Sequence, residues 1–204
     1  MIERDKYNNY RDVNSIEALL SEIERALELR MYYAALHMAL SIPDILSQAA
    51  YDLNKGGKRP YVKWFNENVR NSIFGYLYSE NPLHNENDNT PEINGEVCYA
   101  LRCALLHDGG NDIEDDTKIN EFVLSFTNEE FVRGNYAGVE PKFDKNGKYI
   151  GDKHYLYISC KGLCIDLVNS AKTFIKNNPN LNYQKIRING NGGKINEYFI
   201  IDKK

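Results

Sequence analysis

The chain has 204 residues, of which 42% are hydrophobic and 26% charged, and its formal net charge is −4 at pH 7. This is the size and composition of a globular protein that can bury a substantial core, and the negative charge excludes a surface coated for nonspecific nucleic-acid binding while leaving room for a local basic site. No uncharged apolar run approaches the roughly 18 residues of a membrane-spanning helix, and the charged first thirty residues do not resemble a signal peptide. We therefore expect a cytoplasmic protein with no membrane contact.

The four cysteines, at positions 98, 103, 160 and 164, indicate reduced thiols. They lack the C-x-x-C pairs of a zinc site and the density of a disulfide scaffold. Cys160 and Cys164 would share one face of a helix, where two thiols could bind a metal or oxidise, but ordinary helix packing explains them as well. We expect neither a metal nor a cofactor.

Helical periodicity dominates the first part of the chain. From a cap at Asn14 or Ser15, apolar residues recur at spacings of three, four and seven, which predicts one long amphipathic helix ending near Ile42-Pro43. A fresh cap at Ser41, with proline close behind it, predicts a shorter second helix that Gly56-Gly57 closes.

Two further helices are expected before residue 111. One starts near Pro60 and carries an apolar stripe of Tyr61, Trp64, Phe65 and Val69. Residues 79–95 are mostly turn formers and acids, which predicts an exposed loop. The next helix is capped by Asn94 and terminated by Gly109-Gly110. Its inward face is predicted to be Val97, Ala100, Leu101, Ala104 and Leu105.

After residue 120 the periodicity changes from helical to mixed. Phe122, Leu124 and Phe126 alternate as in a strand, Asn146-Gly147 is a hairpin turn signal, and residues 155–158 form a β-rich run.

The end of the chain predicts one more helix and one more hairpin. The helix is expected at about residues 162–176, and the hairpin would pair residues 186–188 with 198–200. The fold class is therefore mainly α, of the α+β type. We expect a helical bundle at residues 1–110, followed at 111–204 by a smaller mixed β/α extension that packs on it and is not an independent domain.

One pair of residues, Arg102 and His107, points to chemistry. A guanidinium binds phosphate oxygens in a bidentate way, and an imidazole transfers protons near neutral pH. On a straight helix, residues five apart are about 140° out of line. Two copies of the helix crossing in a homodimer would instead supply the arginine from one and the histidine from the other. The C-terminal end of a helix also favours the protonated form of His107.

The spacing alone does not single out this pair. An Arg-x(4 to 6)-His match is expected about half a time by chance in this composition. Arg30 and His37 provide a second match, on the same face of the expected first helix. Arg102 could also simply pair with Glu96 or Asp108 at the surface, while the histidine caps its own helix.

The surroundings of Arg102 favour the later pair. The tract at 99–110, Tyr-Ala-Leu-Arg-Cys-Ala-Leu-Leu-His-Asp-Gly-Gly, resembles the signature of the HEPN superfamily of helical ribonucleases and nucleotide-binding proteins. In that family an Arg-x(4 to 6)-His element lies on a late helix of a small bundle. The resemblance covers about residues 14–110, and the tracts at 39–44 and 57–65 are similar to those of uncharacterised bacterial proteins with such a motif.

This resemblance implies a metal-independent endoribonuclease of the kind bacteria use in defence or toxin systems, acting as a homodimer. Arg102 would hold the scissile phosphate, and His107 would serve as general acid and base while a 2′-hydroxyl attacks the phosphorus. An antitoxin or another protein partner would accompany such an enzyme. The chain departs from active members at Cys103, where they often have a polar residue. The alternative is a noncatalytic HEPN-like module that binds RNA, a nucleotide or a protein.

A basic tract adds candidate substrate-binding residues. Lys55, Lys58 and Arg59 surround two glycines just before an aromatic-rich helix, a combination suited to phosphate contact and base stacking. A cation-rich helix C-terminus explains the same residues. Together with Tyr99, which precedes Arg102 by one turn, they complete the substrate-binding set that we expect.

Overall fold

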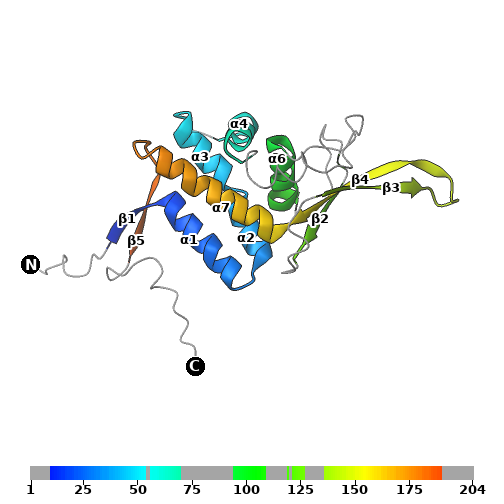
Figure 1. Ribbon diagram of the computed structural model, residues 1–204, viewed down its shortest axis with the longest axis horizontal. Coiled ribbons are helices and arrows are strands. Elements are labelled where there is room, and N and C mark those ends of the chain that lie inside the picture. Colours follow the sequence, from blue (N-terminus) through cyan, green and yellow to red (C-terminus); the bar gives the residue numbers. More distant parts are fainter. Residues whose placement is uncertain are drawn as a thin grey trace, which may run out of the picture.

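The computed structural model describes residues 10–53, 56–69, 94–108, 119, 121–126 and 136–189. Helices dominate, with a smaller part of strands and one long helix toward the C-terminal end, so the expected α+β class is confirmed (Figure 1). In chain order the elements are β1 (Tyr10–Asn14), α1 (Ser15–Glu28), α2 (Tyr32–Ala39), α3 (Ile42–Ala50), α4 (Lys58–Asn68), α6 (Gly95–Cys103), the π-helical turn η2 (Ala104–Asp108), β2 (Glu121–Ser125), β3 (Tyr136–Phe143), β4 (Tyr149–Ser159), α7 (Cys160–Asn177) and β5 (Lys185–Asn189).

The prediction of one long first helix is wrong, because the chain turns after α1 and begins α2 in a new direction. Arg30 has a φ of 59°, in the left-handed region. The N–H of Met31 donates to the carbonyl of Ala26 at 2.8 Å, and that of Arg30 to Leu27 at 3.1 Å. These two bonds form a Schellman motif, which usually has glycine at the left-handed position. Since arginine occupies it here, the sequence carries no stop signal.

The second helix also ends earlier than predicted. α3 stops at Ala50, and the same closure recurs with Asp52 at a φ of 51° and the N–H of Leu53 bonded to the carbonyl of Gln48 at 2.9 Å. Gly57 therefore precedes α4 as its N-cap instead of closing α3. The apolar stripe that the sequence predicts for the helix near Pro60, which is α4, is confirmed, since all four of its residues are buried.

α6 begins where the sequence predicts and lies very close to α4. The side chain of Asn94 accepts hydrogen bonds from the N–H groups of Glu96 and Val97, and all the residues predicted to face inward are buried. The N–H of Gly95 donates to Oδ1 of Asn66 on α4 at 2.8 Å. A Cβ at Gly95 would lie 2.6 Å from the carbonyl oxygen of Val62, so the two backbones can approach this closely only with glycine here.

α7 completes the hydrophobic core by lying across α1, α2 and α3 (Figure 1). Ser159 caps it through a hydrogen bond to the N–H of Gly162. Cys160 and Cys164 share its buried face as predicted, and both are free thiols. The core cluster includes residues of α1 to α4, α6, β2, β4 and α7, so it extends across position 110.

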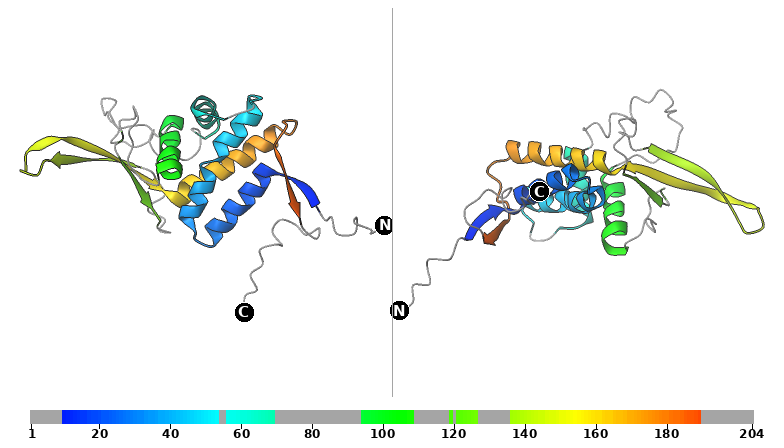
Figure 2. Two further views of the ribbon diagram at one scale, coloured as in Figure 1. Left: turned by 180° about the vertical axis from the view of Figure 1, so that it is seen from behind. Right: turned by 90° about the horizontal axis from the view of Figure 1, so that it is seen from below.

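Two small sheets complete the described fold. β2 pairs with β4 in parallel, and β3 pairs with β4 in antiparallel register, which makes the predicted Asn146-Gly147 turn a true hairpin. This hairpin extends well beyond the helices, as both views in Figure 2 show. β5 pairs with β1, near the other end of the chain. Residues 198–200, predicted as its hairpin partner, lie outside the described residues. No helix in the described ranges is long and apolar enough to cross a membrane.

The contact between α4 and α6 leads to a first prediction. Gly95→Ala should lower the free energy of unfolding by about 2–3 kcal/mol, because the added methyl meets backbone atoms that cannot move aside. Urea denaturation measures the change. Glu96→Ala, at the exposed next position, should cost less than about 0.5 kcal/mol, and an equal loss in both variants would contradict the steric explanation.

A half-buried carboxylate on α7, that of Asp166, gives a second prediction. Burial raises the pKa of Asp166 to about 6. The folded protein therefore keeps a proton between pH 4 and 6 that the unfolded chain releases, and the free energy of unfolding falls as pH rises through this window. Asp166→Asn should leave stability at pH 4 nearly unchanged and raise it by about 2 kcal/mol at pH 8. Glu17→Gln, at an exposed position, is the control in the same urea titrations.

Candidate functional site

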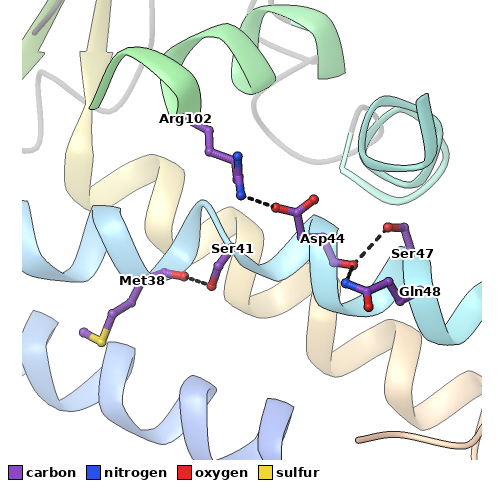
Figure 3. Close-up of polar contacts among 6 residues, drawn as sticks. All are labelled: Met38, Ser41, Asp44, Ser47, Gln48 and Arg102. Atoms are coloured by element: carbon purple, nitrogen blue, oxygen red, sulfur yellow. Dashed lines mark hydrogen bonds and ion pairs between the residues drawn. The ribbon is translucent and has the colours of Figure 1, made fainter. Parts of the chain in front are cut away.

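Arg102 forms an ion pair with Asp44, which joins α6 to the first turn of α3 (Figure 3). The guanidinium Nη2 lies 2.7 Å from the carboxylate Oδ2, and the two side chains are only 20% and 15% exposed. The two helices meet because both pack against α4. The partner that the structure describes for Arg102 is thus not its neighbour Glu96 but a residue far away in the chain. The side chain of Asp108, the other neighbour considered from the sequence, lies outside the described residues.

Side chains of the next turn of α3 hold the backbone of Asp44 in place through hydrogen bonds. Its carbonyl oxygen accepts hydrogen bonds from Ser47 Oγ and Gln48 Nε2, both at 3.1 Å (Figure 3). The positive end of the helix dipole favours a carboxylate at this place. Burial raises the pKa of Asp44, and the nearby Arg102 opposes that rise without cancelling it. The pair is therefore held in poorly hydrated surroundings, where charge interactions are stronger than in water.

Two tyrosines and a thiol lie beside the ion pair. The Tyr99 ring centroid is 5.8 Å from Cζ of Arg102 and 5.2 Å from the Tyr61 ring, in an edge-on arrangement. Burial raises the pKa of Tyr99, and a hydrogen bond with the Cys103 side chain raises it further. Burial likewise raises the pKa of Tyr61, which is completely buried. These five residues, Asp44, Tyr61, Tyr99, Arg102 and Cys103, are called the Arg102 cluster below.

The Arg102 cluster contains two buried polar atoms without a hydrogen-bond partner, the Tyr61 hydroxyl and Nε of Arg102. Most buried polar groups in proteins are paired, and an unpaired one calls for an explanation, of which a catalytic role is one and a bound water another. A guanidinium has five N–H donors. Nε is too deeply buried to reach a ligand, but the ion pair with Asp44 is made through Nη2. The remaining guanidinium donors can therefore serve a second acceptor, such as a phosphate oxygen, while Asp44 holds Arg102 in place.

The backbone after Arg102 widens into η2, a π-helical turn. π-helical turns are rare in proteins, but those that occur are frequently found at functional sites. A π turn closes with bonds between residues five apart, so it has more residues per turn than an α-helix and reduces the offset of about 140° that a straight α-helix would impose between positions 102 and 107. The backbone of His107 belongs to η2, but its side chain lies outside the described residues.

The predicted basic tract lies close to the Arg102 cluster only in part. Lys55 lies outside the described residues. Gly56 packs against Asp44, since a Cβ there would lie 3.1 Å from Oδ1 of that carboxylate. Lys58 and Arg59 are exposed in the first turn of α4, at a helix N-terminus, so a cation-rich C-terminal cap does not explain them.

The competing pair of Arg30 and His37 does not share a helix face. Arg30 lies in the turn between α1 and α2, whereas His37 is on α2 with its ring 4.2 Å from that of Tyr33 and its Nδ1 within 2.9 Å of the Tyr33 carbonyl oxygen. The expectation that both lie on one helix is wrong, because that helix is broken.

No known protein family, curated protein or solved structure matches the chain. The resemblance to HEPN proteins therefore stays a prediction. Across the described ranges, no group of three or more histidine, cysteine or acidic side chains could hold a metal ion.

The ion pair leads to a third prediction. Arg102→Met should lower the free energy of unfolding by about 1–3 kcal/mol at pH 7, because it leaves the Asp44 carboxylate half-buried without its partner. Adding Asp44→Asn should recover part of that loss, which a double-mutant cycle measured by urea denaturation would show as coupling. Arg59→Met, at an exposed position, serves as the control, and additive effects at positions 44 and 102 would contradict the pairing.

The same pair predicts a pH dependence. Because the pKa of Asp44 is raised in the folded protein, its contribution to stability is lost as pH rises above 3.8, the value of an ordinary aspartate. Without Arg102 the pKa should rise further and the loss should extend to higher pH. Arg102→Met should therefore cost more at pH 7.5 than at pH 4, and this difference should vanish in the Asp44→Asn background.

Proposed function

We propose that the chain is a HEPN-type, metal-independent endoribonuclease that acts in the cytoplasm, with Arg102 as the phosphate-binding residue and His107 as the general acid and base. The observation that carries the proposal is η2, a rare wide turn that begins two residues after Arg102 and contains the backbone of His107. The chain resembles the HEPN signature at the same place, from residue 99 to residue 110.

The proposed chemistry uses only an arginine and a histidine of this protein. His107 takes the proton of a ribose 2′-hydroxyl. The 2′ oxygen then attacks the phosphorus, and a 2′-O–P bond forms. The bond from phosphorus to the 5′ oxygen then breaks, and the imidazolium returns a proton to that leaving oxygen. Arg102 donates to the nonbridging oxygens, whose charge grows in the transition state, and Tyr99 lies beside it as a substrate-binding residue.

A second copy of the chain completes the cleft on this proposal. The arginine and histidine of both subunits would then face one phosphate, and an antitoxin or another protein partner would regulate access to it. Lys58 and Arg59 would bind flanking phosphates from the start of α4, together with Lys55, which precedes them in the sequence.

The second candidate is a noncatalytic HEPN-like module that binds RNA, a nucleotide or a protein. The ion pair of Arg102 with Asp44 favours it, because a guanidinium already bound to a carboxylate and 20% exposed can serve purely to join α3 to α6. On that view the Arg102 cluster stabilises the fold and a different surface makes contact with the ligand.

Incubation of the purified chain with labelled single-stranded RNA in EDTA tests the proposal. The wild type should cleave, and Arg102→Ala and His107→Ala should each lower the rate by about 10²-fold or more. Arg30→Ala and His37→Ala, the matched pair from the second Arg-x(4 to 6)-His element, should cleave normally. Intact RNA in the wild-type lane, or loss of activity with Arg30→Ala instead, would refute the assignment.

Mixing the inactive variants tests the shared cleft. If two subunits contribute to one site, a mixture of Arg102→Ala and His107→Ala proteins forms heterodimers that keep one intact arginine and one intact histidine, and part of the activity returns. Arg102→Lys separates folding from chemistry, since lysine keeps the charge near Asp44 but cannot bind phosphate in a bidentate way. Thermal denaturation should show this variant folded while its cleavage is lost.

A further inference from the structure

The hairpin of β3 and β4 ends in an exposed tip that the proposed function does not use. The tip comprises residues 141–150, and all of them are exposed except Asp144, which is half-buried. It lies at the far end of an arm that extends away from the helices in every view (Figures 1 and 2). The arm is anchored at its base, because Leu156 and Ile158 of β4 belong to the hydrophobic core.

The tip combines aromatic rings with positive charge. Phe143 and Tyr149 are paired across the two strands and are 55% and 53% exposed, with ring centroids 6.1 Å apart at an interplanar angle of 71°. Lys142, Lys145 and Lys148 are close to them in the sequence and are also exposed. This positive segment stands out in a chain whose formal net charge is −4.

The one acidic side chain at the tip is used to shape the turn. Oδ1 of Asp144 accepts hydrogen bonds from the N–H groups of Asn146 and Lys148, at 2.8 and 2.9 Å. Gly147 has a φ of 77°, which suits glycine at this turn. The register shifts between Lys142 and Phe143, where Ile150 is an extra residue on β4, and such irregularities change the direction in which nearby side chains point. The aromatic and basic side chains are therefore presented by an ordered turn.

We propose that this tip binds single-stranded RNA, with bases stacked on Phe143 and Tyr149 and phosphates bound by the three lysines. Stacking on exposed rings requires unpaired bases, since bases in a duplex already stack on one another, and exposed lysines in the same turn suit the phosphate backbone that links successive bases. An apolar protein interface would instead be expected to exclude such a density of lysine, which is depleted in protein interfaces. The proposal rests on the proposed function only for the choice of RNA.

Fluorescence anisotropy with the wild-type chain tests it directly. The probe is a labelled 2′-O-methyl RNA strand of about 12 nucleotides, within the usual range of single-strand site sizes, and it lacks the 2′-hydroxyl needed for cleavage. The doubly substituted Phe143→Ala, Tyr149→Ala protein should bind at least about tenfold more weakly. The triple variant Lys142→Gln, Lys145→Gln, Lys148→Gln should reduce the slope of log affinity against log salt by about 2.

A charge-matched control separates the tip from general electrostatics. Lys63→Gln, Lys176→Gln and Lys185→Gln together remove the same charge from other exposed positions and should leave the affinity and the salt slope nearly unchanged. Equal losses in both triple variants, unchanged affinity without the two rings, or equally tight binding to the corresponding RNA duplex would each overturn the proposal. So would a tip variant that changes the sedimentation coefficient but not RNA binding, because the tip would then be an interface between protein chains.

The same proteins distinguish a failure here from a failure of the proposed function. If the wild type binds the strand through the tip but cleaves no RNA, the tip proposal holds and the nuclease assignment falls. If it cleaves RNA while the tip variants keep the wild-type KM and affinity, the nuclease assignment holds and the tip proposal is wrong.

Discussion

The close approach of α4 and α6 is the constraint on which the candidate site depends. At Gly95 the two backbones are in direct contact, and the adjacent hydrogen bond to Asn66 fixes how far α6 can slide along α4. α3 packs on the same helix, so this spacing decides whether Arg102 reaches Asp44. Because position 95 carries no side chain, α6 can pack closely on α4 and bring Arg102 to Asp44 on α3. This meeting of the three helices is the polar junction that contains the ion pair.

That junction combines charge, burial and unused hydrogen-bonding capacity. An arginine fixed by a single carboxylate loses little freedom when it binds a further anion, which is the condition for efficient electrostatic stabilisation. The same carboxylate also neutralises part of the attraction that a phosphate would feel. In a catalytic role Arg102 must divide its hydrogen bonds between Asp44 and a phosphate. In a purely structural role it binds Asp44 alone.

Local signals in the sequence predicted much of the fold and little of the site. The predicted helix cap at Asn94 and the apolar stripe that starts at Tyr61 are confirmed, because both depend on residues within one or two turns of a helix. The sequence does not predict the helix break at Arg30, since nothing in a sequence distinguishes an arginine in the left-handed conformation from one inside a helix. The pairing of Asp44 with Arg102 and that of β1 with β5 depend on distant parts of the chain, for which periodicity carries no information.

The pairing of β1 with β5 also affects the order in which the chain can fold during synthesis. β1 precedes α1 and β5 follows α7, and the core of the early helices is covered only when α7 packs across them. Contacts between such distant segments form late because a long loop must first close. Most of the chain therefore leaves the ribosome before α7 covers the core formed by α1, α2 and α3, and the nascent helices expose apolar surface until then.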